Sequence, residues 1–103
     1  MNKFLKITLL AASGMFSSMT LACTQNNNSI GMVGLDHPSG TVYVSVTSSS
    51  GQCSCSTIRF TSANTDTKMV LSILLAAKMA EKKVRIDFLD INNCNSANRV
   101  YVQ

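Results

Sequence analysis

The fold is decided by residues 66–91, which read DTKMVLSILLAAKMAEKKVRIDFLDI. In the first part, apolar residues recur every three or four positions, which predicts a helix over residues 66–83. In the second part, apolar and polar residues alternate, which predicts a strand over residues 84–91. One face of the helix is expected to pack on a sheet, and it carries Val70, Ile73, Leu74, Ala77 and Ala80.

The opposite face of this helix is more apolar than the exposed face of a helix normally is. Lysine and serine residues are mixed there with apolar ones, namely Leu71, Leu75 and Met79. Single apolar residues are common on protein surfaces and need no partner. The alternative interpretation is that Leu71, Leu75 and Met79 form a contact between subunits.

Alternating patterns predict strands on both sides of residues 66–91. We expect them over residues 30–35, 41–47, 53–61 and 99–102, whereas the polar, Asn-rich residues before position 30 are expected to be coil. The resulting order, β-β-β-α-β-β, is that of the OB-fold, a small and partly open five-stranded barrel. We therefore predict a mainly β, OB-fold-like domain with one helix. The expected inward side chains are Val42, Val44, Val46, Ile58, Phe60, Val84, Ile86, Phe88, Val100 and Val102.

The first 22 residues have the parts of a cleavable export signal. Lys3 and Lys6 precede an apolar run, and small residues lie three before and directly before a cut after Ala22. A membrane anchor is the alternative, but serine and glycine interrupt the run, and a span needs about 20 mainly apolar residues. We expect a signal peptide over residues 1–22 and one domain over residues 23–103, exported to the periplasm or secreted.

The charge of the chain is modest. The net charge is +4, and the chain without residues 1–22 loses two of nine basic residues and carries +2. Nucleic-acid binding needs clustered basic residues with stacking aromatic rings, so we expect no nucleic-acid partner. Sparse charge suits a protein that buries much of its surface against a partner.

The four cysteines are Cys23, Cys53, Cys55 and Cys94, an even number that predicts two disulfides in an exported protein. A bond between Cys53 and Cys55 would be strained, because residues two apart on one strand lie about 6.5–7 Å apart. Two pairings remain open: Cys23–Cys53 with Cys55–Cys94, and the reverse assignment.

The sequence before Cys23 also fits a permissive bacterial lipobox, in which Cys23 is lipidated and tethers an outer-membrane lipoprotein. That modification would leave one of the other three cysteines without a partner. We therefore favour a soluble exported form and expect membrane attachment only if Cys23 is lipidated.

No catalytic or cofactor motif occurs in the sequence. His37 is the single histidine and lies in a predicted turn beside Pro38. The C-x-C spacing of Cys53 and Cys55 fits a zinc site poorly, and a redox pair would need C-x-x-C. We predict no enzymatic activity, no metal and no cofactor.

Two tyrosines, Tyr43 and Tyr101, are expected on the outward faces of their strands, with Arg59 among their polar neighbours. Exposed aromatic and polar side chains of this kind suit a sugar ligand. The alternative, which we favour, is that the tyrosines pair across strands and stiffen the sheet.

The segment KMVLSILLAAK, residues 68–78, followed by KKVRI, residues 82–86, resembles the helix and next strand of subtilase cytotoxin binding subunits and related pertussis-like toxin B subunits. The C-x-C segment and the late Asn-Cys loop are similar in placement. The resemblance implies an OB-fold subunit, often in a ring of five, whose helices line a channel and whose outer faces bind host glycans. Ser29 is the residue nearest to the key serine of members that bind sialylated glycans.

Together these features predict an exported, non-enzymatic binding protein that resembles a toxin B subunit. It is expected to bind a host glycan or a partner protein as a homopentamer, with a toxin A subunit as a candidate partner. The expected glycan-binding residues are Ser29, Tyr43, Arg59 and Tyr101. The alternative is a monomeric periplasmic or lipid-anchored envelope protein with a structural role.

Overall fold

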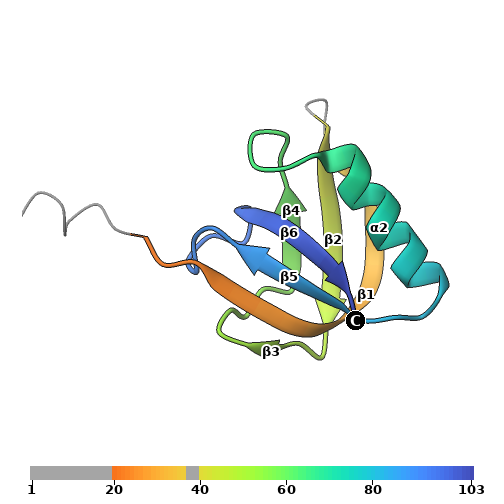
Figure 1. The fold of residues 1–103 in the computed structure, drawn as a ribbon, viewed down its shortest axis with the longest axis horizontal. Coiled ribbons are helices and arrows are strands. Elements are labelled where there is room, and N and C mark those ends of the chain that lie inside the picture. Colours follow the sequence, from red (N-terminus) through yellow and green to blue (C-terminus); the bar gives the residue numbers. More distant parts are fainter. Residues whose placement is uncertain (1–19, 37–39) are drawn as a thin grey trace, which may run out of the picture.

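The computed structural model describes residues 20–36 and 40–103, in which α2 lies beside a twisted sheet (Figure 1). The expected signal peptide lies outside the described residues except for positions 20–22. No helix among the described residues is long and apolar enough to span a membrane. The elements in chain order are β1 (Cys23–Asp36), β2 (Thr41–Thr47), β3 (Ser50–Gly51), β4 (Thr57–Phe60), α2 (Thr67–Met79), β5 (Val84–Phe88) and β6 (Ala97–Val102).

Five of the strands pair with one another in a closed order. β1 pairs with β2, β2 with β4, β4 with β6, β6 with β5, and β5 again with β1. All of these pairings are antiparallel except β4–β6, which is parallel and joins Phe60 to Ala97. The two-residue β3 adds a sixth strand beside β1. The prediction of a mainly β fold with one helix is confirmed for the described residues, with β3 as an unpredicted addition.

The core is formed by the strand faces that the alternation predicts. Val102 is the exception, because it lies at the end of β6 and is 50% exposed, while Val100 is half-buried against the core. The predicted inward residues that are fully buried are Val42, Val44, Val46, Ile58, Phe60, Val84, Ile86 and Phe88.

The prediction of coil over residues 24–29 is wrong, because these residues belong to the 14-residue β1. Gln25 and Asn28 are fully buried, although both are polar. The Gln25 amide donates to Asn28 Oδ1 at 2.6 Å and to the Cys55 carbonyl at 2.8 Å, and it accepts from the Cys55 N–H at 2.8 Å. Asn28 Nδ2 donates to the carbonyls of Gln25 and Val84. Every buried amide group therefore has a partner, as burial of polar groups requires.

The predicted strand over residues 53–61 is also too long, since β4 begins at Thr57. The segment before it is irregular and is tied to the sheet by disulfides Cys23–Cys53 and Cys55–Cys94. This is one of the two pairings left open by the sequence. Because the Cys23 sulfur is bonded to Cys53, it is not available for the thioether bond of a lipid anchor.

Helix α2 begins after Asp66, whose carboxylate accepts from the Met69 N–H at 3.3 Å. It packs against β1, β2 and β6. Of its predicted core face, Val70, Leu74 and Ala77 are buried, Ile73 is half-buried and Ala80 is exposed.

The helix ends at Met79, four residues earlier than predicted. The Lys82 N–H donates to the Ala77 carbonyl at 2.9 Å, and the Glu81 N–H donates to the Lys78 carbonyl at 3.1 Å. These two bonds form a Schellman motif, in which the residue after the cap adopts a left-handed conformation. Here that residue is Glu81, with φ 56°, and not the usual glycine.

Candidate functional site

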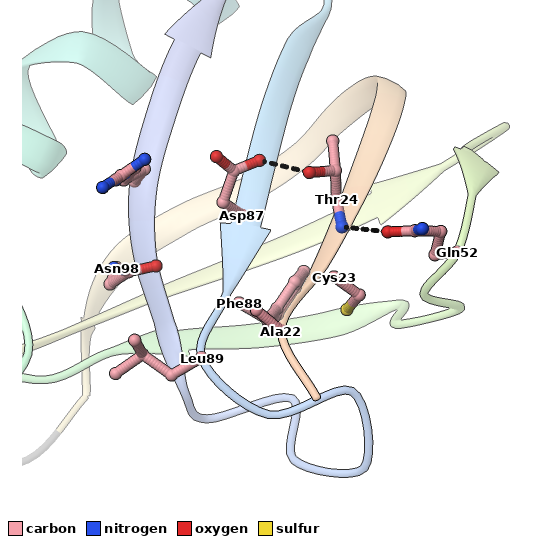
Figure 2. Close-up of a pocket in the computed structure, with 9 residues that line it drawn as sticks. Ala22, Cys23, Thr24, Gln52, Asp87, Phe88, Leu89 and Asn98 are labelled. Carbon is pink, nitrogen blue, oxygen red and sulfur yellow. Dashed lines mark hydrogen bonds between the residues drawn. The ribbon is translucent and has the colours of Figure 1, made fainter. Parts of the chain in front are cut away.

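A cavity of about 380 Å³ opens on the outer face of β1, β5 and β6 (Figure 2). Hydroxyl, amide, carboxylate and guanidinium groups line it beside a few apolar side chains, a mixture typical of small-molecule sites. We call it the Asp87 cavity, and its lining residues are Ala22, Cys23, Thr24, Gln52, Asp87, Phe88, Leu89, Asn98 and Arg99.

Strand register places the central side chains of this cavity in a row. Thr24 of β1 is the register partner of Asp87 in β5, and Asp87 is the register partner of Arg99 in β6. Side chains alternate between faces along a strand, so these three lie on the face opposite the buried Gln25 and Ile86. Figure 2 shows Thr24 pointing toward Asp87 across the two strands.

Asp87 is the electrostatic centre of the cavity and is only 8% exposed. Its Oδ1 accepts from Thr24 Oγ1 at 2.9 Å and from Arg85 Nε at 3.0 Å, and its Oδ2 accepts from Arg85 Nη2 at 3.0 Å. Burial alone would raise the pKa of Asp87. Hydrogen bonds from Arg85 and Thr24, with the charges of Arg85 and Arg99, outweigh burial and lower that pKa below its ordinary value. Asp87 is therefore an ionised, fixed acceptor at neutral pH.

The same cavity holds hydrogen-bond donors that the fold does not use. Gln52 Oε1 accepts from the Thr24 N–H at 3.3 Å, which leaves the Gln52 NH₂ group available (Figure 2). The side chains of Asn98 and Arg99 make no hydrogen bond with any described residue. A ligand in this cavity therefore meets one anionic acceptor and several donors, an arrangement that suits a molecule with several hydroxyl groups.

The four expected glycan-binding residues do not lie together. Tyr101 packs against Arg85 across β5 and β6, with 5.0 Å from the guanidinium carbon to the ring centroid, and so lies beside the Asp87 cavity. Tyr43 and Arg59 form an equivalent pair at 5.3 Å across β2 and β4, where Arg59 also forms an ion pair with Asp36.

The other three expected glycan-binding residues line two other cavities. Tyr43 and Arg59 belong to one of about 300 Å³, with Met32 and Leu35 on its rim. Ser29 belongs to another near the end of α2. The two tyrosines each pair across strands, but with arginine and not with each other, because β2 and β6 are not neighbours in the sheet.

Sequence reasoning missed most of the Asp87 cavity. The alternation of Arg85 and Asp87 along a predicted strand placed both outward and was the available signal. No sequence signal marked Thr24 or Gln52 as part of this cavity, because Thr24 lies in a segment predicted to be coil and Gln52 lies between predicted strands.

The expected subunit contact on α2 is only partly exposed. Leu71 is half-buried and packs against the core. Leu75 and Met79, one helical turn apart, are 42% and 85% exposed. Two of the three expected contact residues are therefore exposed on one face of α2.

Comparison of the chain with protein-family models, with curated proteins and with solved structures found no match. The two disulfides indicate an oxidising environment such as the periplasm or the extracellular space.

Proposed function

We propose that this is an exported, non-enzymatic OB-fold protein that binds a glycan in the Asp87 cavity. The fold part of the proposal is supported by the closed circuit β1-β2-β4-β6-β5, with the parallel β4–β6 contact and α2 between β4 and β5. OB-folds bind oligosaccharides or oligonucleotides on one face of the barrel and its loops. The low net charge of the chain favours the sugar.

The observation that carries the proposal is the ionised Asp87 carboxylate beside unused donors. Its Oδ2 accepts one hydrogen bond, from Arg85, and so has room for another. Asn98, Gln52 and Arg99 supply the donors. Each sugar hydroxyl both donates and accepts, so adjacent hydroxyls can satisfy the carboxylate and an amide together. The exposed ring of Tyr101, just beyond the cavity, offers an apolar surface to the sugar ring.

The test is a glycan array followed by calorimetric titration of the best ligand, using the full chain purified after export. Arg99→Gln removes an exposed donor and is expected to weaken binding about tenfold, as hydrogen bonds to charged groups contribute about 1.5–3 kcal/mol. Asp87→Asn is expected to weaken binding at least as much. Arg59→Gln is the control, because it removes an arginine that lies outside the Asp87 cavity, where it pairs with Tyr43. The proposal is wrong if the array shows no ligand, or if Arg59→Gln and Arg99→Gln weaken binding equally.

The exposed apolar side chains of Leu75 and Met79 support a second proposal, that the protein acts as a homo-oligomer through α2. Light scattering during size-exclusion chromatography measures the mass directly. We expect the wild-type chain to have a multiple of the subunit mass. The variant Leu75→Glu/Met79→Glu should have the mass of one subunit. A wild-type mass of one subunit would instead favour the monomeric envelope protein.

A further inference from the structure

A second concave surface, also of about 380 Å³, lies between the C-terminal end of α2 and the middle of β1. Its lining contains three ammonium groups, one carboxylate and one hydroxyl, and we call it the lysine cavity. We propose that the lysine cavity binds a tetrahedral oxyanion, as a phosphate or sulfate ester. Its lining residues are Ser29, Ile30, Lys78, Glu81, Lys82 and Lys83.

The turn after α2 is what gathers the lysines. The left-handed conformation of Glu81 reverses the chain, so that Lys82 and Lys83 return toward Lys78 of the last helical turn. The last carbonyls of the helix accept backbone N–H groups from the Schellman motif. The lysine side chains are therefore not needed to satisfy the C-terminal carbonyls of α2.

The charges in this cavity are largely uncompensated within the described residues. Lys78 donates to the Gly31 carbonyl, which fixes its ammonium group over the bulge of β1. The side-chain ammonium groups of Lys82 and Lys83 make no hydrogen bond and no ion pair with any described residue. Three like charges around one concave surface repel one another, and Glu81 offsets only one of them. An anion bound among them would remove this repulsion.

The kind of donor indicates the kind of anion. Arginine forks match planar carboxylates in a bidentate manner, whereas lysine acts as a point charge that suits phosphate. The lysine cavity contains no arginine, and its donors come from two elements: the helix end and Ser29 of β1. Donors that approach from separate directions fit a tetrahedral group with several oxygens. The proposal does not depend on glycan binding in the Asp87 cavity, which is lined by different residues.

The test is a calorimetric or NMR titration of the full chain, purified after export, with inorganic phosphate at low ionic strength. Saturable binding is expected, and it should weaken as salt is added. Lys82→Gln/Lys83→Gln is expected to weaken it at least tenfold, and Glu81→Gln to strengthen it about threefold. Lys68→Gln, at the other end of α2, is the control and should change the affinity less than twofold. Absence of saturable binding, or an equal loss in Lys68→Gln, would overturn the proposal.

Two further binding experiments distinguish a soluble ester from a lipid headgroup. Glucose 6-phosphate that competes with inorganic phosphate would support a soluble phosphorylated or sulfated saccharide. Cosedimentation with vesicles containing phosphatidylglycerol, lost in Lys82→Gln/Lys83→Gln, would support a lipid headgroup. If neither probe binds, the cavity is not a site for phosphate esters and the proposal fails. Because both lysines lie outside the Asp87 cavity, such a failure leaves the glycan proposal unaffected.

Discussion

Replacement of Gln25 by methionine should destabilise the protein, although it puts an apolar side chain in place of a polar one at a buried position. The side chain is fully buried, and methionine has nearly the same shape but cannot form its hydrogen bonds. The substitution leaves three buried groups without a partner: the N–H and C=O of Cys55, and Oδ1 of Asn28. Each such group costs about 1–3 kcal/mol. After a gain of about 1 kcal/mol from apolar burial, we expect a net loss of about 2–8 kcal/mol.

Equilibrium unfolding in urea, with both disulfides intact, measures this loss on the full chain purified after export. A small domain has a slope of about 1–1.5 kcal/mol/M, so the midpoint of Gln25→Met should fall by at least about 1.3 M. Gln52→Met is the control, because the Gln52 side chain is exposed and makes a single hydrogen bond, of 3.3 Å. It should lose less than about 0.5 kcal/mol.

The result that refutes this reasoning is a loss in Gln25→Met below about 1 kcal/mol, or one no larger than in Gln52→Met. Either would mean that the buried amides do not hold β1 in the sheet. The whole stability of a domain is about 5–15 kcal/mol, so the expected effect is large enough to decide the question.

Three other substitutions test separate features. Glu81→Gly should stabilise the chain by about 1 kcal/mol in urea unfolding, because glycine adopts the left-handed conformation of this position without strain; no gain would argue against the Schellman turn. Asp87 has a lowered pKa in the folded state, so its stabilising contribution is complete above about pH 3.8 and is lost as the pH falls through the folded-state pKa. Unfolding measured between pH 7 and 2 should therefore show a smaller loss of stability at acid pH in Asp87→Asn than in the wild type, and equal losses would contradict the pairing with Arg85. Cys55→Ser/Cys94→Ser opens a connection between residues 39 apart and should cost about 4 kcal/mol of unfolding free energy, provided the variant folds as judged by circular dichroism.

The parts of the fold that the sequence predicts correctly are those in which apolar residues carry the pattern. The valines of β2 and the inward face of α2 are examples, because burial of apolar side chains leaves a periodicity of two or of about 3.6. The first part of β1, before residue 30, gave no such pattern, because Gln25 and Asn28 occupy its inward positions as a hydrogen-bonded network. The predicted end of α2 is too late for a related reason. Glycine at position 81 would have indicated the end of the helix, but this left-handed position is occupied by Glu81.

The same cause limited the prediction of the site. Arg99 could be placed outward from the alternation of β6, but its place in one cavity with Thr24 depends on the pairing of β5 with both β1 and β6. Long-range pairing of strands is not encoded in local periodicity. A site that is built across three strands therefore becomes visible only when the register is known.

The pairing of β1 with β5 also sets the order in which the protein can fold. Thr24 and Asp87 meet across 63 positions of the chain, so the first strand has no partner on that side until most of the sequence is present. Chains are synthesised at about 5–20 residues per second, which delays this contact by about 3–13 s. An N-terminal portion of the chain cannot close the circuit of strands by itself. A chain exported as proposed would therefore complete its sheet and the Asp87 cavity only after β5 and β6 have crossed the membrane.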